Sequence, residues 1–192
     1  MWAYESVFYQ IYPMGFCGVP FENDGVQRHE IKHVEDWIPH MQKLGVNAVY
    51  FSPVFESDTH GYNTRDYRKI DVRLGTNEDF KEVCDALHRA GIRVVLDGVF
   101  SHTGSDSRYF NREGRYGEGG AYRDPNSPYR SWYDFDPKYK GGYRSWWGFE
   151  TLPEVNEENP SYVEFITGEG GVIDTWLRRG AAGFRVGGGA RG

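Results

Sequence analysis

The stretch TNEDFKEVCDALHRAGIRVVLDGVFSH, residues 76–102, has the pattern of a helix that leads directly into a buried strand. Asp79 follows Thr76 by three residues, a variant of the capping box, so we expect a helix to begin here and to end at Gly91. Its apolar positions recur at helical spacing: Phe80, Val83, Cys84 and Leu87. The continuous apolar run IRVVL, residues 92–96, is typical of a parallel strand that is covered on both faces.

The same alternation continues on both sides of this stretch. We expect further strands at residues 7–12, 46–51 and 183–186. A helix is expected before Gly45, with these residues on its apolar face: Val34, Trp37, Ile38, Met41 and Leu44. A last helix should begin after Asn159-Pro160, break at residues 168–171 and resume. This order predicts an α/β fold with parallel strands joined by right-handed crossovers.

A long insertion separates the third expected strand from the fourth. Residues 104–150 contain no Val, Ile, Leu or Met, but 13 aromatic residues and 8 glycines. Such a segment cannot build an aliphatic core, so its rings either line a cleft or pack among themselves as a loop excursion. Of Trp132, Trp146 and Trp147, we expect at most one to face a cleft.

Composition excludes several classes of protein. The 192 residues carry a net charge of −6, which does not favour a nucleic-acid partner. No apolar run approaches the ~20 residues of a membrane span, and residues 1–5 do not resemble a signal peptide. Cys17 and Cys84 are too few for a disulfide framework and indicate reduced thiols, hence a cytoplasmic protein.

Residues that could carry chemistry follow the second, third and fourth strands. Tyr62 lies in a loop of rings and carboxylates, residues 60–71; Asp97 and His102 follow the third strand, and Arg185 lies in the fourth. Carboxyl ends of parallel strands meet at one edge, the usual site of function in such folds. The alternatives are tyrosines that only pack, a satisfied loop histidine and a capping aspartate.

Five ordered motifs together resemble glycoside hydrolase family 13, the α-amylase family. They are VFYQIYP (7–13), HGYNTRDY (60–67), DGVFSH (97–102), LPEVN (152–156) and GFRV (183–186). The resemblance implies the first four βα units of a TIM (β/α)8 barrel, with a small loop-rich domain inserted after the third strand. The barrel part would comprise residues 1–103 and 159–192, and the insert residues 104–158.

The resemblance also implies an activity and roles for single residues. The family cleaves or transfers α-glucosidic bonds with retention, so an α-glucan or maltooligosaccharide would be the partner. By its pattern Tyr62 would stack on the sugar at the cleavage point and His102 would hydrogen-bond it. Asp97 would support the site, and Arg185 would orient the nucleophile.

The family's nucleophile, an Asp two residues after that arginine, is replaced here by Gly187. The general-acid Glu would lie after a fifth strand, beyond residue 192. Retaining hydrolysis needs both carboxyl groups. We therefore expect the N-terminal half of such an enzyme, inactive alone; the alternative is a non-catalytic α-glucan-binding or non-functional half barrel. Exposed strand edges would favour self-association.

Three further patterns are interpreted as chance or surface features. Residues 29–33 match HExxH, but no third zinc ligand follows. The tail, residues 187–192, matches GxGxxG, but no helix follows it. Asp134 and Asp136 could bind calcium, but are more typical of surface charge, and Ser101 precedes His102 where the family often has Asn. We expect no cofactor, with calcium as the alternative.

Overall fold

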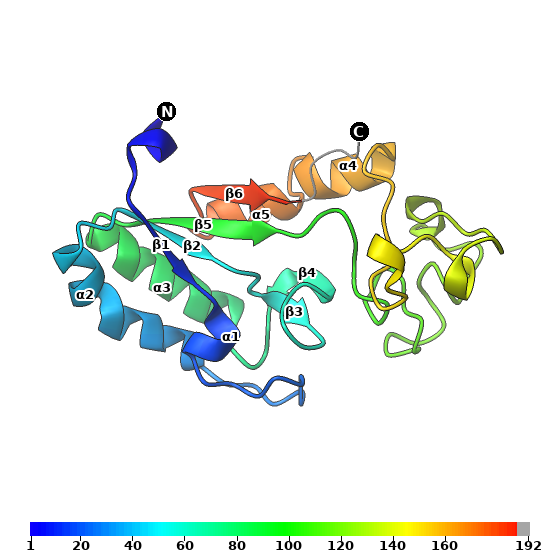
Figure 1. The fold of residues 1–192 in the computed structure, drawn as a ribbon, viewed down its shortest axis with the longest axis horizontal. Helices are drawn as coiled ribbons and strands as arrows, with labels where there is room; N and C mark the ends of the chain where they lie inside the picture. Colours follow the sequence, from blue (N-terminus) through cyan, green and yellow to red (C-terminus); the bar gives the residue numbers. More distant parts are fainter. Residues whose placement is uncertain (188–192) are drawn as a thin grey trace.

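A computed structural model describes residues 1–187 of the chain. Its centre is a four-stranded sheet in the order β1-β2-β5-β6, and each neighbouring pair is parallel (Figure 1). The strands are β1 Phe8–Ile11, β2 Ala48–Phe51, β5 Arg93–Gly98 and β6 Gly183–Val186. All four predicted strands are confirmed, and the α/β class with them.

Helix α3, Asn77–Arg89, follows the prediction from its local signals. The Thr76 side chain accepts a hydrogen bond from the Asp79 backbone N–H, and the Asp79 carboxylate accepts one from the Thr76 N–H. Helix α3 packs against η2 (Glu30–Trp37), β4 (Thr64–Ile70) and β5. The four predicted apolar residues are fully buried: Phe80, Val83, Cys84 and Leu87. Gly91 has φ +77°, a conformation that favours glycine and ends the helix.

The prediction of one α-helix before Gly45 is wrong. Residues Glu30–Trp37 form a 3₁₀ helix, η2, and only Ile38–Lys43 form an α-helix, α2. Pro39 explains the break, because it has no N–H for the carbonyl four residues earlier and its ring clashes there. As a result Trp37 and Leu44 are exposed rather than buried.

The last two helices are α4, Pro160–Thr167, and α5, Val172–Arg178, separated by residues 168–171 as expected. The Asn159 side chain caps α4 by accepting from the Ser161 and Tyr162 backbone N–H groups. Two short N-terminal helices were not predicted: η1, Trp2–Glu5, and α1, Pro13–Phe16.

The loop after β2 contains an antiparallel pair that the sequence analysis treated as loop. Strand β3, Phe55–Ser57, pairs with β4, Thr64–Ile70, with register shifts between its residues. The hairpin turn therefore lies at residues 58–63, and this turn carries Tyr62.

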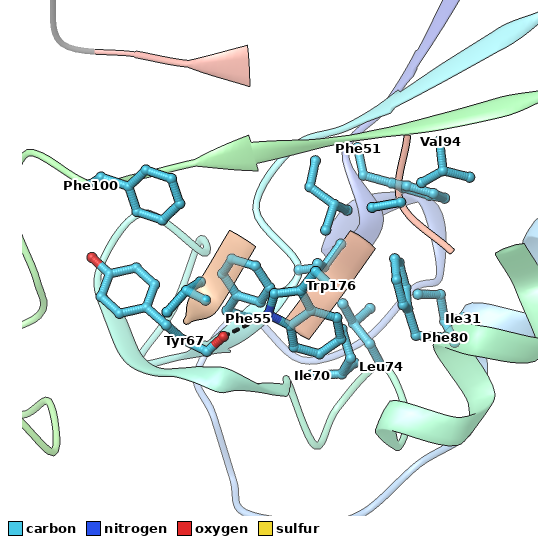
Figure 2. Close-up of a cluster of buried hydrophobic side chains, with 14 of the residues drawn as sticks. Ile31, Phe51, Phe55, Tyr67, Ile70, Leu74, Phe80, Val94, Phe100 and Trp176 are labelled. Atoms are coloured by element: carbon cyan, nitrogen blue, oxygen red, sulfur yellow. Dashed lines mark hydrogen bonds between the residues drawn. The ribbon is translucent and has the colours of Figure 1, made fainter. Parts of the chain in front are cut away.

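The core joins this hairpin to the helices. Trp176 of α5 is fully buried between Phe55 of β3 and Phe80 of α3, with ring centroids 5.1 and 5.5 Å away (Figure 2). Its indole N–H donates to the backbone carbonyl of Tyr67, 2.8 Å away. Trp176 thus connects α5 to β3, β4 and α3, which are distant from it in the sequence.

Residues 104–158 contain turns, isolated β-bridges and three short 3₁₀ helices: η3 Arg130–Trp132, η4 Lys140–Gly142 and η5 Trp146–Gly148. Phe110 lies at the centre of their packing, 4.8 Å from the Tyr133 ring and 4.7 Å from the Tyr143 ring. Aromatic rings therefore replace the missing aliphatic core. The domain boundaries at residues 104 and 158 stay a prediction.

No helix among residues 1–187 is both long enough and apolar enough to cross a membrane. Cys17 and Cys84 are free thiols. Burial raises the pKa of the Cys84 thiol to about 12, so this sulfur is not a reactive thiolate.

Candidate functional site

A pocket of about 690 Å³ lies where β5 and β6 end at the carboxyl edge of the sheet. Its walls come from the β3–β4 hairpin turn, from the segment after β5, from η5 and the residues that follow it, and from β6. Polar side chains are concentrated at the sheet end, and apolar ones on the η5 side. The lining residues are His60, Tyr62, Asn63, Asp97, Gly98, Val99, Ser101, His102, Trp146, Phe149, Thr151, Leu152, Arg185 and Gly187.

Asp97 is the polar centre of this pocket. It is buried at 2% exposure, and its carboxylate accepts hydrogen bonds from the hydroxyls of Tyr62, at 3.1 Å, and Tyr50. Arg185 Nη1 approaches the other carboxylate oxygen at 3.4 Å. Asp97 and Arg185 are register partners on neighbouring parallel strands, so both project from the same face of the sheet.

Tyr50 was not predicted as a site residue. In β2, Val49 and Phe51 are fully buried while Tyr50 is only half-buried, and the period of two places its side chain on the opposite face. Burial and the bond to Asp97 raise the Tyr50 pKa, so its hydroxyl stays protonated and acts as a donor. Residues 48–51 are apolar on both faces of the strand, so no local signal marks Tyr50, and only the fold brings it to Asp97.

Tyr62 is held in place by its turn. Gly61 has φ +103°, and an added Cβ there would lie 2.9 Å from the Pro53 Cβ, so only glycine fits. The Tyr62 backbone N–H donates to His60 Nδ1, and the two rings lie 5.9 Å apart. Burial and the nearby Asp97 charge raise the Tyr62 pKa, which keeps this hydroxyl protonated as well.

The His102 ring contacts the backbone of Tyr62. Its Nε2 lies 2.9 Å from the Tyr62 carbonyl, which can only accept, so Nε2 carries the proton. Ser101 Oγ contacts Nδ1 at 3.0 Å, and burial lowers the His102 pKa, which favours the neutral ring. In this structure both ring nitrogens therefore have protein partners. The predicted hydrogen bond from His102 to a sugar stays a prediction.

Helix η5 contributes a further part of the pocket wall. The Trp146 ring lies 5.6 Å from the His102 ring and lines the pocket. Trp132 is buried, and Trp147 is exposed but does not line the pocket. Of the three tryptophans singled out in the sequence, one thus faces the cleft, within the expected maximum.

The position expected for a nucleophile lies in the same pocket. Gly187 lines it, and a Cβ added there would collide with the Arg185 guanidinium. Arg185 is itself half-exposed and free to move aside. Among the lining residues, Asp97 alone carries a carboxyl group.

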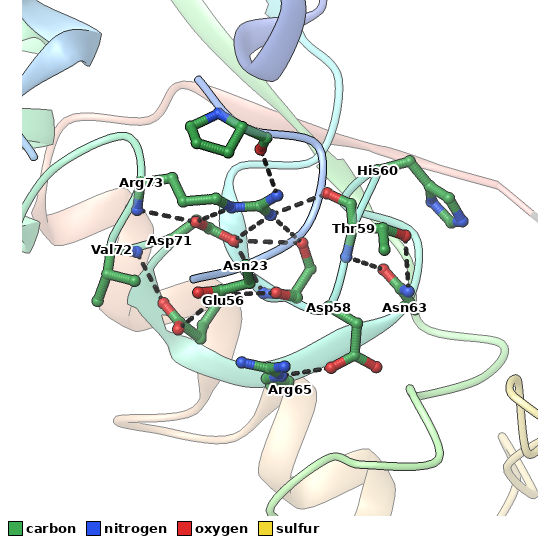
Figure 3. Close-up of polar contacts among 12 residues, drawn as sticks. Asn23, Glu56, Asp58, Thr59, His60, Asn63, Arg65, Asp71, Val72 and Arg73 are labelled. Atoms are coloured by element: carbon green, nitrogen blue, oxygen red, sulfur yellow. Dashed lines mark hydrogen bonds and ion pairs between the residues drawn. The ribbon is translucent and has the colours of Figure 1, made fainter. Parts of the chain in front are cut away.

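A buried ionic cluster contacts the start of the hairpin turn (Figure 3). Arg73 and Asp71 have fully buried side chains and pair through Nη2 and Oδ2 at 2.8 Å. Arg73 also donates to the carbonyl of Thr59, at 2.8 Å, and to that of Pro20, at 3.0 Å. Because Thr59 precedes His60, the cluster fixes the start of the turn that presents Tyr62.

The described residues contain no group of three His, Cys, Asp or Glu side chains that could hold a metal ion. In the HExxH match, His29 bonds Asp79 at 2.5 Å, whereas His33 bonds Asp36 at 3.1 Å. The histidines thus pair with different carboxylates.

The candidate calcium ligands are also engaged. Asp134 accepts from the Tyr139 hydroxyl, and Asp136 pairs with Lys138. Gly189 and Gly192 of the GxGxxG match lie outside the described residues.

Comparison with known proteins gives consistent results. The family model of the α-amylase catalytic domain matches residues 10–189. An amylopullulanase of Thermoanaerobacterium saccharolyticum is 36% identical over 88% of this chain, and neopullulanase 2 of Thermoactinomyces vulgaris is 32% identical over 96%. The matches span only 15% and 34% of those two proteins.

Solved structures show the same relation. The cyclic α-maltosyl-(1→6)-maltose hydrolase of Arthrobacter globiformis superposes with a TM-score of 0.78 at 28% identity. That match covers 97% of this chain and 44% of the hydrolase. The debranching enzyme of Nostoc punctiforme gives a TM-score of 0.76 at 31% identity, covering 96% of this chain and 42% of the enzyme.

Proposed function

Since the chain belongs to the α-amylase family of glycoside hydrolases, we propose that it is the N-terminal half of a retaining, α-glucan-active hydrolase or transglycosylase. The chain would contribute four βα units of the barrel and the segment inserted after the third strand. The observation that carries the proposal is the convergence of Tyr62, Asp97 and Arg185 at the carboxyl edge of a parallel sheet.

The site divides sugar recognition among its residues. Tyr62 offers an aromatic face on which a pyranose ring can stack. Asp97 accepts hydrogen bonds from two tyrosine hydroxyls. Its carboxylate also offers an acceptor for the hydroxyls of a sugar that stacks on the Tyr62 ring. His102 keeps the Tyr62 backbone in position through its Nε2–H. Pullulan-type and maltosyl-containing glucans are the substrates that this proposal favours, since the amylopullulanase, the neopullulanase and the cyclic α-maltosyl-(1→6)-maltose hydrolase carry such names.

Cleavage of a glucan requires catalytic carboxyl groups that residues 1–192 do not provide. Retention needs a nucleophile and an acid/base about 5–5.5 Å apart. The pocket contains one carboxyl residue, Asp97, and Gly187 stands at the nucleophile position. We therefore propose that residues 1–192 alone bind α-glucan without cleaving it.

One face of the sheet favours association with a further chain segment or a second copy. Phe8 is 45% exposed, and it lines a second cavity of about 710 Å³ together with Tyr50 and Val95. These residues would be covered in a closed barrel. The alternative to an enzyme half is a non-catalytic α-glucan-binding or non-functional half barrel, and association is expected in both cases.

Calorimetric titration of the 192-residue chain tests the proposal, with maltoheptaose as ligand and a β-1,4-linked glucan as control. We expect binding of maltoheptaose only, weakened by Tyr62→Ala, and no release of reducing sugar. Hydrolysis by the pure chain would overturn the argument from Gly187. Absence of heat at millimolar maltoheptaose would overturn glucan recognition.

A further inference from the structure

An exposed aromatic surface lies beside the pocket and takes no part in the core of residues 104–158. Phe110 and Tyr143 are buried there, whereas Trp147 is 75% exposed and Phe149 is 58% exposed. Large rings in water lose the burial that normally stabilises them. A pair of such rings at the mouth of a pocket marks a binding surface rather than packing.

The backbone at Trp147 supports this interpretation. Its φ of 53° and ψ of 23° lie in the left-handed region, which bulky side chains rarely adopt. Backbone hydrogen bonds nevertheless fix the turn: Trp146 N–H donates to the Leu152 carbonyl at 2.9 Å, and Phe149 N–H to the Trp146 carbonyl at 3.0 Å. Backbone strain at a residue whose exposed ring contributes little to packing is typical of functional positions.

The rings continue the wall of the pocket outward. Trp146 lines the pocket in contact with the His102 ring, and its own ring lies 5.9 Å from the Trp147 ring, with an angle of 60° between the ring planes. On the other side the Phe149 ring is stacked at 6.4 Å and 26°. The surface therefore begins at the pocket and extends past it.

We propose that Trp146, Trp147 and Phe149 form a stacking subsite for α-linked glucosyl units that starts at the pocket wall and extends past it to Trp147. This inference rests on the proposed function and adds a preference for chain length. The apolar C–H faces of a pyranose pack on aromatic rings. A rigid, preformed surface binds such a chain with little ordering cost. Tyr62 lines the pocket and Trp147 does not, so we expect a longer oligosaccharide to gain more from Trp147 than a disaccharide bound at Tyr62.

The test compares Trp147→Gly and Trp147→Ala in the 192-residue chain by calorimetry, with maltose and maltoheptaose. Both variants remove the ring, but only glycine also relieves the left-handed backbone. We expect both to weaken maltoheptaose binding about threefold to tenfold and to change maltose binding less than twofold. The Tm of the glycine variant should not fall below that of the alanine variant. Tyr4→Ala, at an 86% exposed ring in η1, is the matched control and should bind as wild type.

The outcomes separate this inference from the proposed function. Unchanged maltoheptaose binding in both Trp147 variants, with loss in Tyr62→Ala, would refute the subsite and leave the proposed function intact. Equal weakening of maltose and maltoheptaose would also refute it, because the ring would then act at the pocket itself. Wild type that binds neither sugar would overturn both.

Discussion

Replacing Arg73 by methionine should destabilise the protein far more than its position in a loop suggests. The guanidinium and the Asp71 carboxylate are both fully buried and joined by two hydrogen bonds of 2.8 Å. Arg73 also donates to three backbone carbonyls, those of Pro20, Phe21 and Thr59. Methionine fills a similar volume but supplies no donor.

The size of the expected stability loss follows from the buried Asp71 carboxylate that Arg73→Met leaves unpaired. Removing one partner of a buried ion pair leaves an uncompensated charge and costs about 3–5 kcal/mol. For a domain of this size 1 kcal/mol corresponds to about 2–4 °C in Tm. The expected fall in Tm is therefore about 6–20 °C. The unpaired Thr59 carbonyl should also loosen the turn that carries Tyr62, so maltoheptaose binding should weaken in the folded variant.

Thermal unfolding followed by circular dichroism measures this loss, with guanidinium titration as the second method. Lys81→Ala is the matched control, because it breaks a solvent-exposed pair with Asp85 that should contribute little to stability. The double variant Arg73→Met, Asp71→Asn should lose less than the sum of the single variants. A Tm for Arg73→Met within 2 °C of the Lys81→Ala value, a margin of about 1 kcal/mol, would refute the reasoning.

Three further predictions concern the helices. Thr76→Ala removes the acceptor for the Asp79 N–H and should cost about 1 kcal/mol, measured by guanidinium unfolding; no change would contradict the role of the cap. Trp176→Phe keeps much of the ring but leaves a buried carbonyl without its donor, so it should cost about 1–3 kcal/mol, and Trp176→Ala about 3–5 kcal/mol. Burial would raise the pKa of Asp79, but its hydrogen bonds to Thr76 and His29 outweigh burial and lower it. Stability from this carboxylate is thus present above the ordinary Asp pKa and lost as the pH falls below it. Tm should drop less between pH 7 and pH 3 in Asp79→Asn than in wild type, and an equal drop would contradict the assignment.

Local signals explain the parts of the fold that the sequence predicted correctly. The capping box at Thr76 and the apolar period up to Leu87 specify α3 without reference to any other element. The four residues predicted for the site all line the pocket, while their roles toward a sugar stay predictions: Tyr62, Asp97, His102 and Arg185. Their convergence follows from a general property of parallel sheets, whose carboxyl ends meet at one edge.

Other features depended on partners that are distant in the chain. Strand β3 has only three residues and no clear alternation, and it exists because β4 pairs with it. In η2, Trp37 has the spacing of a core residue, yet Pro39 changes the helix and leaves the ring exposed. Propensity alone could not anticipate either outcome.

The sequence by itself determined the alternation of helices and strands, the family motifs and the glycine at position 187. Only the tertiary structure decided how the site groups share their hydrogen bonds. Tyr50 and Tyr62 both donate to Asp97, and the His102 Nε2 faces the Tyr62 carbonyl rather than open solvent. The physical reason is that capping and periodicity act over a few residues, whereas the partner of a buried polar group is whichever group the packed chain brings within about 3 Å.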